Sequence, residues 1–232
     1  MPHSPTSSPY QWHTLPLEED TVVRLRRPSG GPANAVFVLL HGWTGDETFM
    51  LRFAEVAPPS SLVVSFRAPY PARSPRGGYS WVDYLPDDRP PTAAAYRPAL
   101  AALRRWLTAL ANRFPSPAWE TQHWIGFSQG ASTAALYTLE HPRHAATLAL
   151  LAGFLPRDTE AWVQRQPLTG KRVFIAHGRA DTIVPLHHAR HARALLAQAG
   201  AEVVYCEDDV AHKVSARCHK ALKAFYAPPS AR

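Results

Sequence analysis

The fold of this chain is decided by Gly126-Phe127-Ser128-Gln129-Gly130, which stands between an apolar strand pattern at 122–125 and a helical pattern at 131–140. The spacing Gly-x-Ser-x-Gly is typical of a nucleophile elbow, a sharp strand-to-helix turn that leaves little room for a Cβ beside the serine. Such a turn places Ser128 Oγ at the top of a sheet, where N–H groups of the following helix face it. The alternative is a tight turn with a solvated serine, and the flanking patterns favour the elbow.

A serine hydroxyl is a weak nucleophile and needs a base, which in turn needs an acid to orient it. In hydrolases with this elbow the acid follows the serine along the chain and the histidine comes last. A short apolar strand at 171–176 leads to Asp181, and a second one at 201–206 leads to His212. The carboxyl ends of parallel strands gather at one edge of a sheet, so we expect Asp181 and His212 to lie beside Ser128.

Each partner also has a simpler interpretation. Asp181 could cap the helix that begins near Pro185, and His212 could be an ordinary surface residue among the twelve histidines. Asp208 and Asp209 are rival acids, but both stand directly before His212 on the same loop. The expected acid comes one strand earlier, which favours Asp181.

The loop after the most hydrophobic strand, 35–40, is the candidate partner for the developing oxyanion. This strand runs into His41-Gly42-Trp43-Thr44-Gly45, and glycine allows a backbone to approach a reacting atom closely. We expect the two donors to be the backbone N–H groups of Trp43 and of Gln129. His41 itself is interpreted as a structural histidine that holds this loop.

Four segments together carry a resemblance to a known family. They are Leu40-His41-Gly42-Trp43-Thr44-Gly45-Asp46; Arg67-Ala68-Pro69 with Gly77-Gly78-Tyr79-Ser80-Trp81-Val82-Asp83; the elbow; and His177-Gly178-Arg179-Ala180-Asp181-Thr182-Ile183-Val184-Pro185. The chain resembles serine esterases of the α/β-hydrolase superfamily, and within it the phospholipase/carboxylesterase family, which includes the acyl-protein thioesterases. Two positions depart from the family pattern: Ala211 replaces a glycine before the histidine, and Val82 replaces an aromatic residue. Neither removes a reacting group.

The resemblance implies an α/β-hydrolase fold with a mostly parallel central sheet and helices on both faces. It also implies a carboxylesterase that cleaves a small-molecule ester, with short to medium acyl chains, through an acyl-enzyme on Ser128. A thioesterase or lysophospholipase of the same fold is an alternative, and a non-catalytic binding protein of this fold is an alternative of another class. The complete Ser128, Asp181 and His212 set argues against the latter.

Strand and helix patterns alternate along the chain, which predicts a parallel sheet covered on both faces. We expect a single domain at 10–227, with a disordered lead-in at 1–9 and a tail at 228–232, and no insertion long enough for a lid domain. We also expect a leading β-hairpin at 10–28. Helices are expected at 47–57, 93–113, 129–140, 186–199 and 212–226.

Substrate-binding residues are less well defined by the sequence. Trp81 lies in a Pro- and Arg-rich loop at 68–92, and it either forms an acyl-binding wall or simply packs onto the sheet. Phe154 and Leu155, in a short insert at 153–168, are further candidates for the wall.

His187 and His191 stand one helical turn apart, as in some metal sites, with His188 between them. No acidic residue completes a metalloprotease helix motif, so we interpret them as solvated helix residues. We therefore expect neither a metal ion nor another cofactor.

Composition sets further limits. The 232 residues carry a net charge of +7, but the basic residues are dispersed, so we expect no nucleic-acid partner. No apolar run is long enough to span a membrane, and no signal peptide is recognisable at the N-terminus. The two cysteines, Cys206 in a strand and Cys218 in the last helix, imply no disulfide framework. A cytoplasmic location is the default expectation, and a homodimer is compatible with the sequence.

Overall fold

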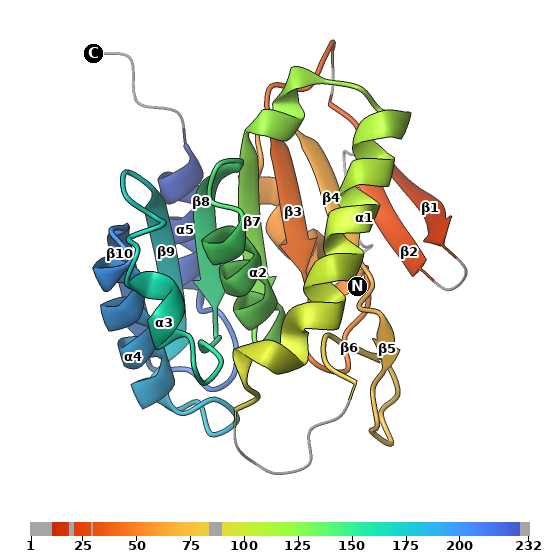
Figure 1. Cartoon of the computed structure of the whole chain (residues 1–232). Coiled ribbons are helices and arrows are strands. Elements are labelled where there is room, and N and C mark those ends of the chain that lie inside the picture. The colour runs from red at the N-terminus through yellow and green to blue at the C-terminus, as the bar shows by residue number, and fades with distance from the viewer. Residues whose placement is uncertain (1–10, 19–20, 29, 84–89, 228–232) are drawn as a thin grey trace, which may run out of the picture.

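The computed structural model describes residues 11–18, 21–28, 30–83 and 90–227 (Figure 1). The predicted lead-in at 1–9 and the tail at 228–232 lie outside these residues.

An eight-stranded sheet runs through the middle of the molecule in the order β1-β2-β4-β3-β7-β8-β9-β10. The pairs β1–β2 and β2–β4 are antiparallel and all the other pairs are parallel, which confirms the leading hairpin and the mostly parallel sheet. The strands are β1 Trp12–Glu18, β2 Thr21–Arg26, β3 Val36–Leu40, β4 Leu62–Phe66, β7 Gln122–Phe127, β8 Ala145–Leu151, β9 Arg172–Gly178 and β10 Glu202–Asp208.

The remaining elements lie between these strands or, in the case of α5, after the last of them. They are the 3₁₀ helices η1 Phe49–Val56, η2 Ala93–Tyr96 and η3 Pro117–Glu120, the α-helices α1 Arg97–Arg113, α2 Gln129–Glu140, α3 Glu160–Val163, α4 Leu186–Gln198 and α5 Ala216–Tyr226, and a separate two-stranded ribbon of β5 Tyr70–Pro71 and β6 Tyr79–Ser80. In the described part of the chain no inserted domain lies over the sheet edge that carries the site, as expected.

Three predicted helices differ from the observed ones. In the helix expected at 93–113, residues 93–96 form the 3₁₀ helix η2, and α1 begins at Arg97. The helix expected at 47–57 is the 3₁₀ helix η1. The last helix begins at Ala216 rather than at 212, because the hydroxyl of Ser215 accepts a hydrogen bond from the N–H of Cys218 and caps the helix there. As a result His212 stays in a loop, where its ring can reach the sheet edge.

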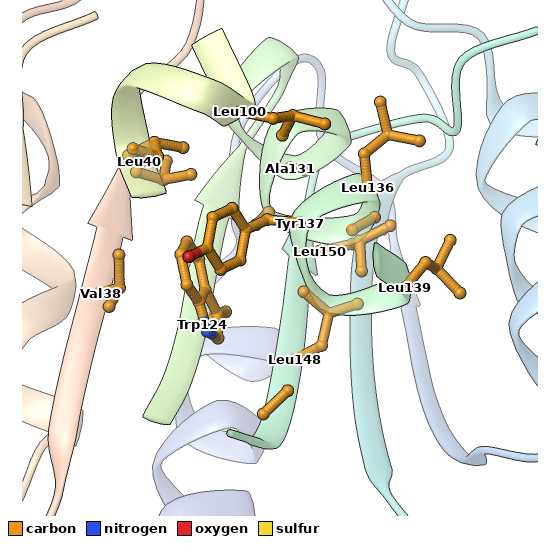
Figure 2. Packing of buried hydrophobic residues seen from close by; sticks show 14 of the residues in the cluster. Val38, Leu40, Leu100, Trp124, Ala131, Leu136, Tyr137, Leu139, Leu148 and Leu150 are labelled. Carbon is orange, nitrogen blue, oxygen red and sulfur yellow. The ribbon is translucent and has the colours of Figure 1, made fainter. Parts of the chain in front are cut away.

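Both faces of the sheet are buried. On one face, the side chains of β3, β7 and β8 pack against α1, α2 and α4; on the other they pack against η1 and α5 (Figure 1). Figure 2 shows the first of these layers, in which Trp124 of β7 lies against Tyr137 of α2 with ring centroids 4.4 Å apart. Central parallel strands that are covered on both sides need continuous apolar runs, and β3 is buried at every position.

The order of the strands creates a switch point between β3 and β7. These two strands are neighbours, yet the chain leaves β3 toward β4 on one side and leaves β7 toward β8 on the other. Helices and loops therefore diverge at the carboxyl ends of β3 and β7, which opens a crevice in sheets of this kind. The elbow and the loop at 41–47 both lie at that edge.

The two cysteines correct the expectation drawn from the sequence. Cys206 is a buried residue of β10 and Cys218 lies in α5, as predicted, but the structure joins them in a disulfide bond. Composition alone could not reveal this, because the bond depends on α5 packing back against the end of β10.

Among the described residues, no helix is both long enough and apolar enough to cross a lipid bilayer.

Candidate active site

Ser128 occupies the sharp turn between β7 and α2, with φ 52° and ψ −120°. A non-glycine residue with positive φ is strained, and strain of this kind persists where the surroundings enforce it. The two flanking glycines explain how the turn fits. A Cβ on Gly126 would lie 2.3 Å from the carbonyl oxygen of Gly130, and one on Gly130 would lie 2.3 Å from that of Leu40. The turn therefore has the geometry of a nucleophile elbow.

Three side chains from three strand ends meet at this turn. The Nε2 atom of His212 lies 3.0 Å from Ser128 Oγ, and its Nδ1 atom lies 2.7 Å from Asp181 Oδ2. A carboxylate can only accept, so Nδ1–H donates to Asp181 and Nε2 is left to accept the proton of the serine hydroxyl. The sequence predicted that these three residues would lie together, and the structure brings them together.

Asp181 is held in place by the backbone as well as by the histidine. Its Oδ1 accepts hydrogen bonds from the N–H groups of Ile183 and Val184, each at 2.9 Å, and its side chain is fully buried. The helix-cap interpretation does not apply, because α4 begins after Pro185 without a side-chain cap. The rival acids are engaged elsewhere, Asp208 with Arg217 at 3.3 Å and Asp209 with Arg179 at 2.9 Å.

The loop that carries His212 passes close to the loop that carries Asp181. A Cβ on Gly178 would lie 2.1 Å from the carbonyl oxygen of Val210 and 2.3 Å from that of Ala211, so glycine is required there for the two loops to touch. Ala211 is not among the residues with positive φ. The alanine that replaces the glycine of the family pattern is therefore unstrained, and His212 keeps both its contacts.

The loop after β3 lies directly against the serine. A Cβ on Gly42 would lie 3.1 Å from Ser128 Cβ. No acceptor for the backbone N–H of Trp43 is found among the described residues, and Gln129, as the first residue of α2, has no intrahelical acceptor. These are the two N–H groups that the sequence predicts as oxyanion donors: Gln129 directly follows Ser128, and Trp43 follows Gly42, which lies against Ser128.

His41 fixes this loop and does not face the serine. Its ring is fully buried, with Nδ1 2.7 Å from the carbonyl oxygen of Gly42 and Nε2 accepting the N–H of Ala68 at 3.0 Å. Burial lowers the pKa of His41 to about 4, so the ring is neutral at pH 7. The structural role expected from the sequence agrees with this geometry.

Trp81 does not form an acyl-binding wall. Its side chain is 0% exposed, and its indole N–H donates to the carbonyl oxygen of His41 at 2.8 Å. Its backbone N–H donates to Gln129 Oε1 at 2.8 Å, so the residue ties the loop at 41–47 to α2. Leu155 is likewise buried in the core, away from the cavity, whereas Phe154 lines it.

The cavity in front of Ser128 has a volume of about 1400 Å³ and is open to solvent. One of its walls was not foreseen. Phe127 packs against Phe49 and Phe53 of η1, with ring centroids 5.1 and 6.5 Å away, and against the ring of His212 at 5.1 Å. Phe127 occupies the second position of the Gly-x-Ser-x-Gly motif, so its place next to Ser128 could have been inferred from the sequence. No motif marks Phe49 or Phe53 as part of the cavity wall.

A second histidine lies behind the carboxylate. His177 Nε2 donates to the carbonyl oxygen of Val184 at 2.8 Å and lies 3.5 Å from Asp181 Oδ2. Burial lowers the pKa of His177, which keeps its ring neutral at pH 7. It therefore shapes the turn around Asp181 without competing as a cation with His212.

The histidines of α4 do not form a metal centre in the structure. In the described ranges, no group of three or more His, Cys, Asp or Glu side chains is arranged to hold a metal ion. His191 lies 3.5 Å from Glu160, and His188 lines the cavity near Phe154.

A model of the phospholipase/carboxylesterase family matches residues 26–227. The chain belongs to this family. Membership in the phospholipase/carboxylesterase family identifies the protein as a carboxylic ester hydrolase with the α/β-hydrolase fold. None of the curated proteins compared with the chain matches it.

Solved structures share this fold over most of the chain. A carboxylesterase from Mesorhizobium loti is 24% identical with a TM-score of 0.75, and covers 92% of this chain and 99% of its own. A Bacillus cereus carboxylesterase is 21% identical, with a TM-score of 0.75 and coverage of 89% and 93%. Acyl-protein thioesterase 2 from Zea mays is 21% identical, with a TM-score of 0.69 and coverage of 88% and 96%.

Proposed function

We propose that this member of the phospholipase/carboxylesterase family is a serine carboxylesterase that acts through an acyl-enzyme on Ser128. The observation that carries the proposal is the unbroken line of contacts from Asp181 Oδ2 to His212 and on to Ser128 Oγ, at 2.7 and 3.0 Å, beside an open cavity. This is the arrangement in which a hydroxyl can lose its proton as it attacks.

In the first step, Ser128 Oγ attacks the ester carbonyl while His212 Nε2 takes its proton. Asp181 orients the ring through Nδ1–H and stabilises the imidazolium that forms. The negative charge on the carbonyl oxygen is stabilised by the N–H groups of Trp43 and Gln129. His212 then gives its proton to the leaving alcohol, which departs and leaves the acyl group on Ser128.

In the second step, His212 takes a proton from water, and the resulting hydroxide attacks the acyl-enzyme at the same carbonyl. Collapse of this intermediate releases the carboxylic acid and returns the proton to Ser128 Oγ. Neither step as proposed requires a metal or a cofactor.

The acyl group is proposed to be short to medium in length and to lie against Phe127, Phe49 and Phe154, which line the cavity. Cleavage of a thioester or a lysophospholipid would use the same groups, so a matched oxoester and thioester pair is the comparison that separates these activities. A homodimer remains a prediction that sedimentation can test.

The cytoplasmic location also remains a prediction. The Cys206–Cys218 bond bears on it, because disulfides persist mainly in oxidising compartments. Thiol alkylation in intact cells, followed by mass spectrometry, would give the redox state of the pair in its native compartment.

The test of the proposed function is hydrolysis of p-nitrophenyl esters from acetate to palmitate by the unmodified protein and by Ser128→Ala. We expect Ser128→Ala to lose about 10⁶-fold in kcat. Ser60→Ala is the control, because Ser60 lies before β4 at the opposite edge of the sheet. Acid-quenched samples should show the acyl mass on Ser128 alone.

Undiminished turnover in Ser128→Ala would contradict the acyl-enzyme. Absence of turnover on every ester by the folded unmodified protein would favour a narrow thioester substrate or a binding function.

A further inference from the structure

The cavity in front of Ser128 is lined by positive charge only, as far as the described residues go. Arg52, Arg73, Arg76 and Lys213 line it, and no aspartate or glutamate does. These residues come from separate segments: η1, the β5–β6 hairpin and the loop after His212. The positive charge is therefore a property of the whole mouth of the cavity and not of one basic stretch.

Three of these cations form no ion pair with an acidic residue in the part of the chain that the structure describes. Arg52, Arg76 and Lys213 form no ion pair with another described residue, while Arg73 lies 3.8 Å from Asp83. We call Arg52, Arg76 and Lys213 the cationic rim. All three are exposed.

The carboxylates of the neighbouring segments are occupied by other groups. Glu47 pairs with Arg67 at 2.7 Å, and Glu55, on η1 with Arg52, pairs with Lys223 at 3.0 Å. Asp181 is buried behind His212. Among the described residues, no carboxylate is therefore paired with the rim, which can attract an anion from solvent.

Phe49, Phe53 and Phe127, here called the apolar wall, lie between the cationic rim and the reacting centre. The guanidinium carbon of Arg52 lies 4.8 Å from the centroid of the Phe49 ring, which packs on Phe127, and Phe127 packs on His212. Lys213 directly follows His212 in the chain. Apolar walls beside charges of one sign concentrate the electrostatic potential in a cleft and raise the local concentration of ligands of opposite charge.

We propose that the ester cleaved by this protein carries a negatively charged group, such as a carboxylate, which the cationic rim of Arg52, Arg76 and Lys213 binds while the ester carbonyl lies at Ser128. This inference rests on the proposed function and narrows it to a class of substrate. The wall binds the hydrocarbon part of that ester and the rim binds its charge.

The test compares esters that differ in charge but little in size. One series places the charge on the acyl group: mono-p-nitrophenyl esters of adipic, suberic and sebacic acid against their neutral methyl-capped forms. A second pair places it on the alcohol: the butyrate esters of 4-hydroxybenzoate and of 4-hydroxybenzamide. We expect kcat/KM to favour the anionic ester by about threefold to tenfold in at least one series at low salt.

Salt and matched variants show where the preference arises. The preference should shrink toward one at about 0.5 M salt, where charges are screened beyond a few ångströms. The triple variant Arg52→Gln, Arg76→Gln, Lys213→Gln should lose it, and each single variant should weaken it. The control triple Arg143→Gln, Arg165→Gln, Lys220→Gln lowers the net charge equally, from +7 to +4, at exposed residues outside the cavity, and should keep it.

Two results would overturn the inference while leaving the proposed function intact: equal or better hydrolysis of the neutral ester in both series, or an equal loss of preference in the control triple. Failure to hydrolyse any ester would overturn the proposed function, and the inference with it. The single variants keep the comparison decisive if the triple variant does not fold.

Discussion

The Oδ2 atom of Asp181 lies 2.7 Å from Nδ1 of His212, while its Oδ1 atom accepts two backbone N–H groups. One carboxylate oxygen of Asp181 is therefore hydrogen-bonded to the backbone of its own turn, and the other is hydrogen-bonded to the histidine. This division positions the imidazole, because the turn cannot shift without moving the acceptor.

Replacing Asp181 by asparagine should lower kcat by about 10³- to 10⁴-fold with little change in the far-UV circular dichroism. The amide can still accept the two backbone N–H groups, but its NH₂ group cannot accept from His212 Nδ1–H. Steady-state kinetics on one p-nitrophenyl ester measures the effect. Asp209→Asn is the matched control, since Asp209 pairs with Arg179, and a comparable loss there would contradict the assignment of the acid.

Trp81 and Phe154 should respond differently to substitution. Trp81→Phe removes the hydrogen bond to the carbonyl oxygen of His41 and should lower the free energy of unfolding by about 1–2 kcal/mol, without changing the preferred acyl length. Phe154→Ala removes a ring from the cavity lining and should change the preferred acyl length. Urea unfolding and the p-nitrophenyl ester series measure the two effects. A changed acyl preference in Trp81→Phe would show that the wall extends further than the structure indicates.

Acid should destabilise the fold through His41. Its pKa is lowered from 6.5 to about 4 by burial, so the unfolded chain takes up a proton at higher pH than the folded one. Stability from the neutral ring is therefore fully present above pH 6.5 and is lost as the pH falls toward 4, by up to roughly 3 kcal/mol at about 1.4 kcal/mol per pKa unit. Protonation would also deprive the Ala68 N–H of its acceptor.

Urea unfolding at several pH values between 7 and 4.5 measures this loss. His41→Asn should show a shallower decline than the unmodified protein, whatever its stability at pH 7. An identical decline in both proteins would show that other groups are responsible.

The disulfide should contribute about 3 kcal/mol to stability, since it closes a loop with a sequence separation of 12 residues. The double variant Cys206→Ser, Cys218→Ser should unfold at lower urea concentration than the oxidised protein. Dithiothreitol should shift the unmodified protein toward the variant and leave the variant unchanged. Equal midpoints for the oxidised and reduced protein would contradict a stabilising bond.

The convergence of Ser128, Asp181 and His212 was predictable because their positions follow from local signals. Each stands at the end of a short apolar strand, and parallel strands bring such ends to one edge. The glycines of the elbow could be interpreted in advance for the same reason, as the turn itself demands them. Even Cys206 and Cys218 were assigned to the correct strand and helix.

What the sequence could not supply were contacts between segments distant along the chain. Trp81 is buried because the segment after β6 packs against the start of α2, where Gln129 Oε1 accepts the backbone N–H of Trp81. The wall around Phe127 needs η1 to lie against the end of β7, and the disulfide needs α5 to return to β10. No periodicity or motif within one segment predicts such contacts between segments.

The disulfide also makes residues 206–218 a covalent ring that contains His212, the residue in contact with Ser128 Oγ. Trypsin cuts after lysine and arginine, and Lys213 and Arg217 are both exposed within that ring. A backbone cut there would leave α5 tethered to β10 through sulfur, so the nicked protein would migrate as one chain until it is reduced. The single peptide segment that carries His212 is thus anchored at both ends, and breaking its backbone once does not set the C-terminal helix free.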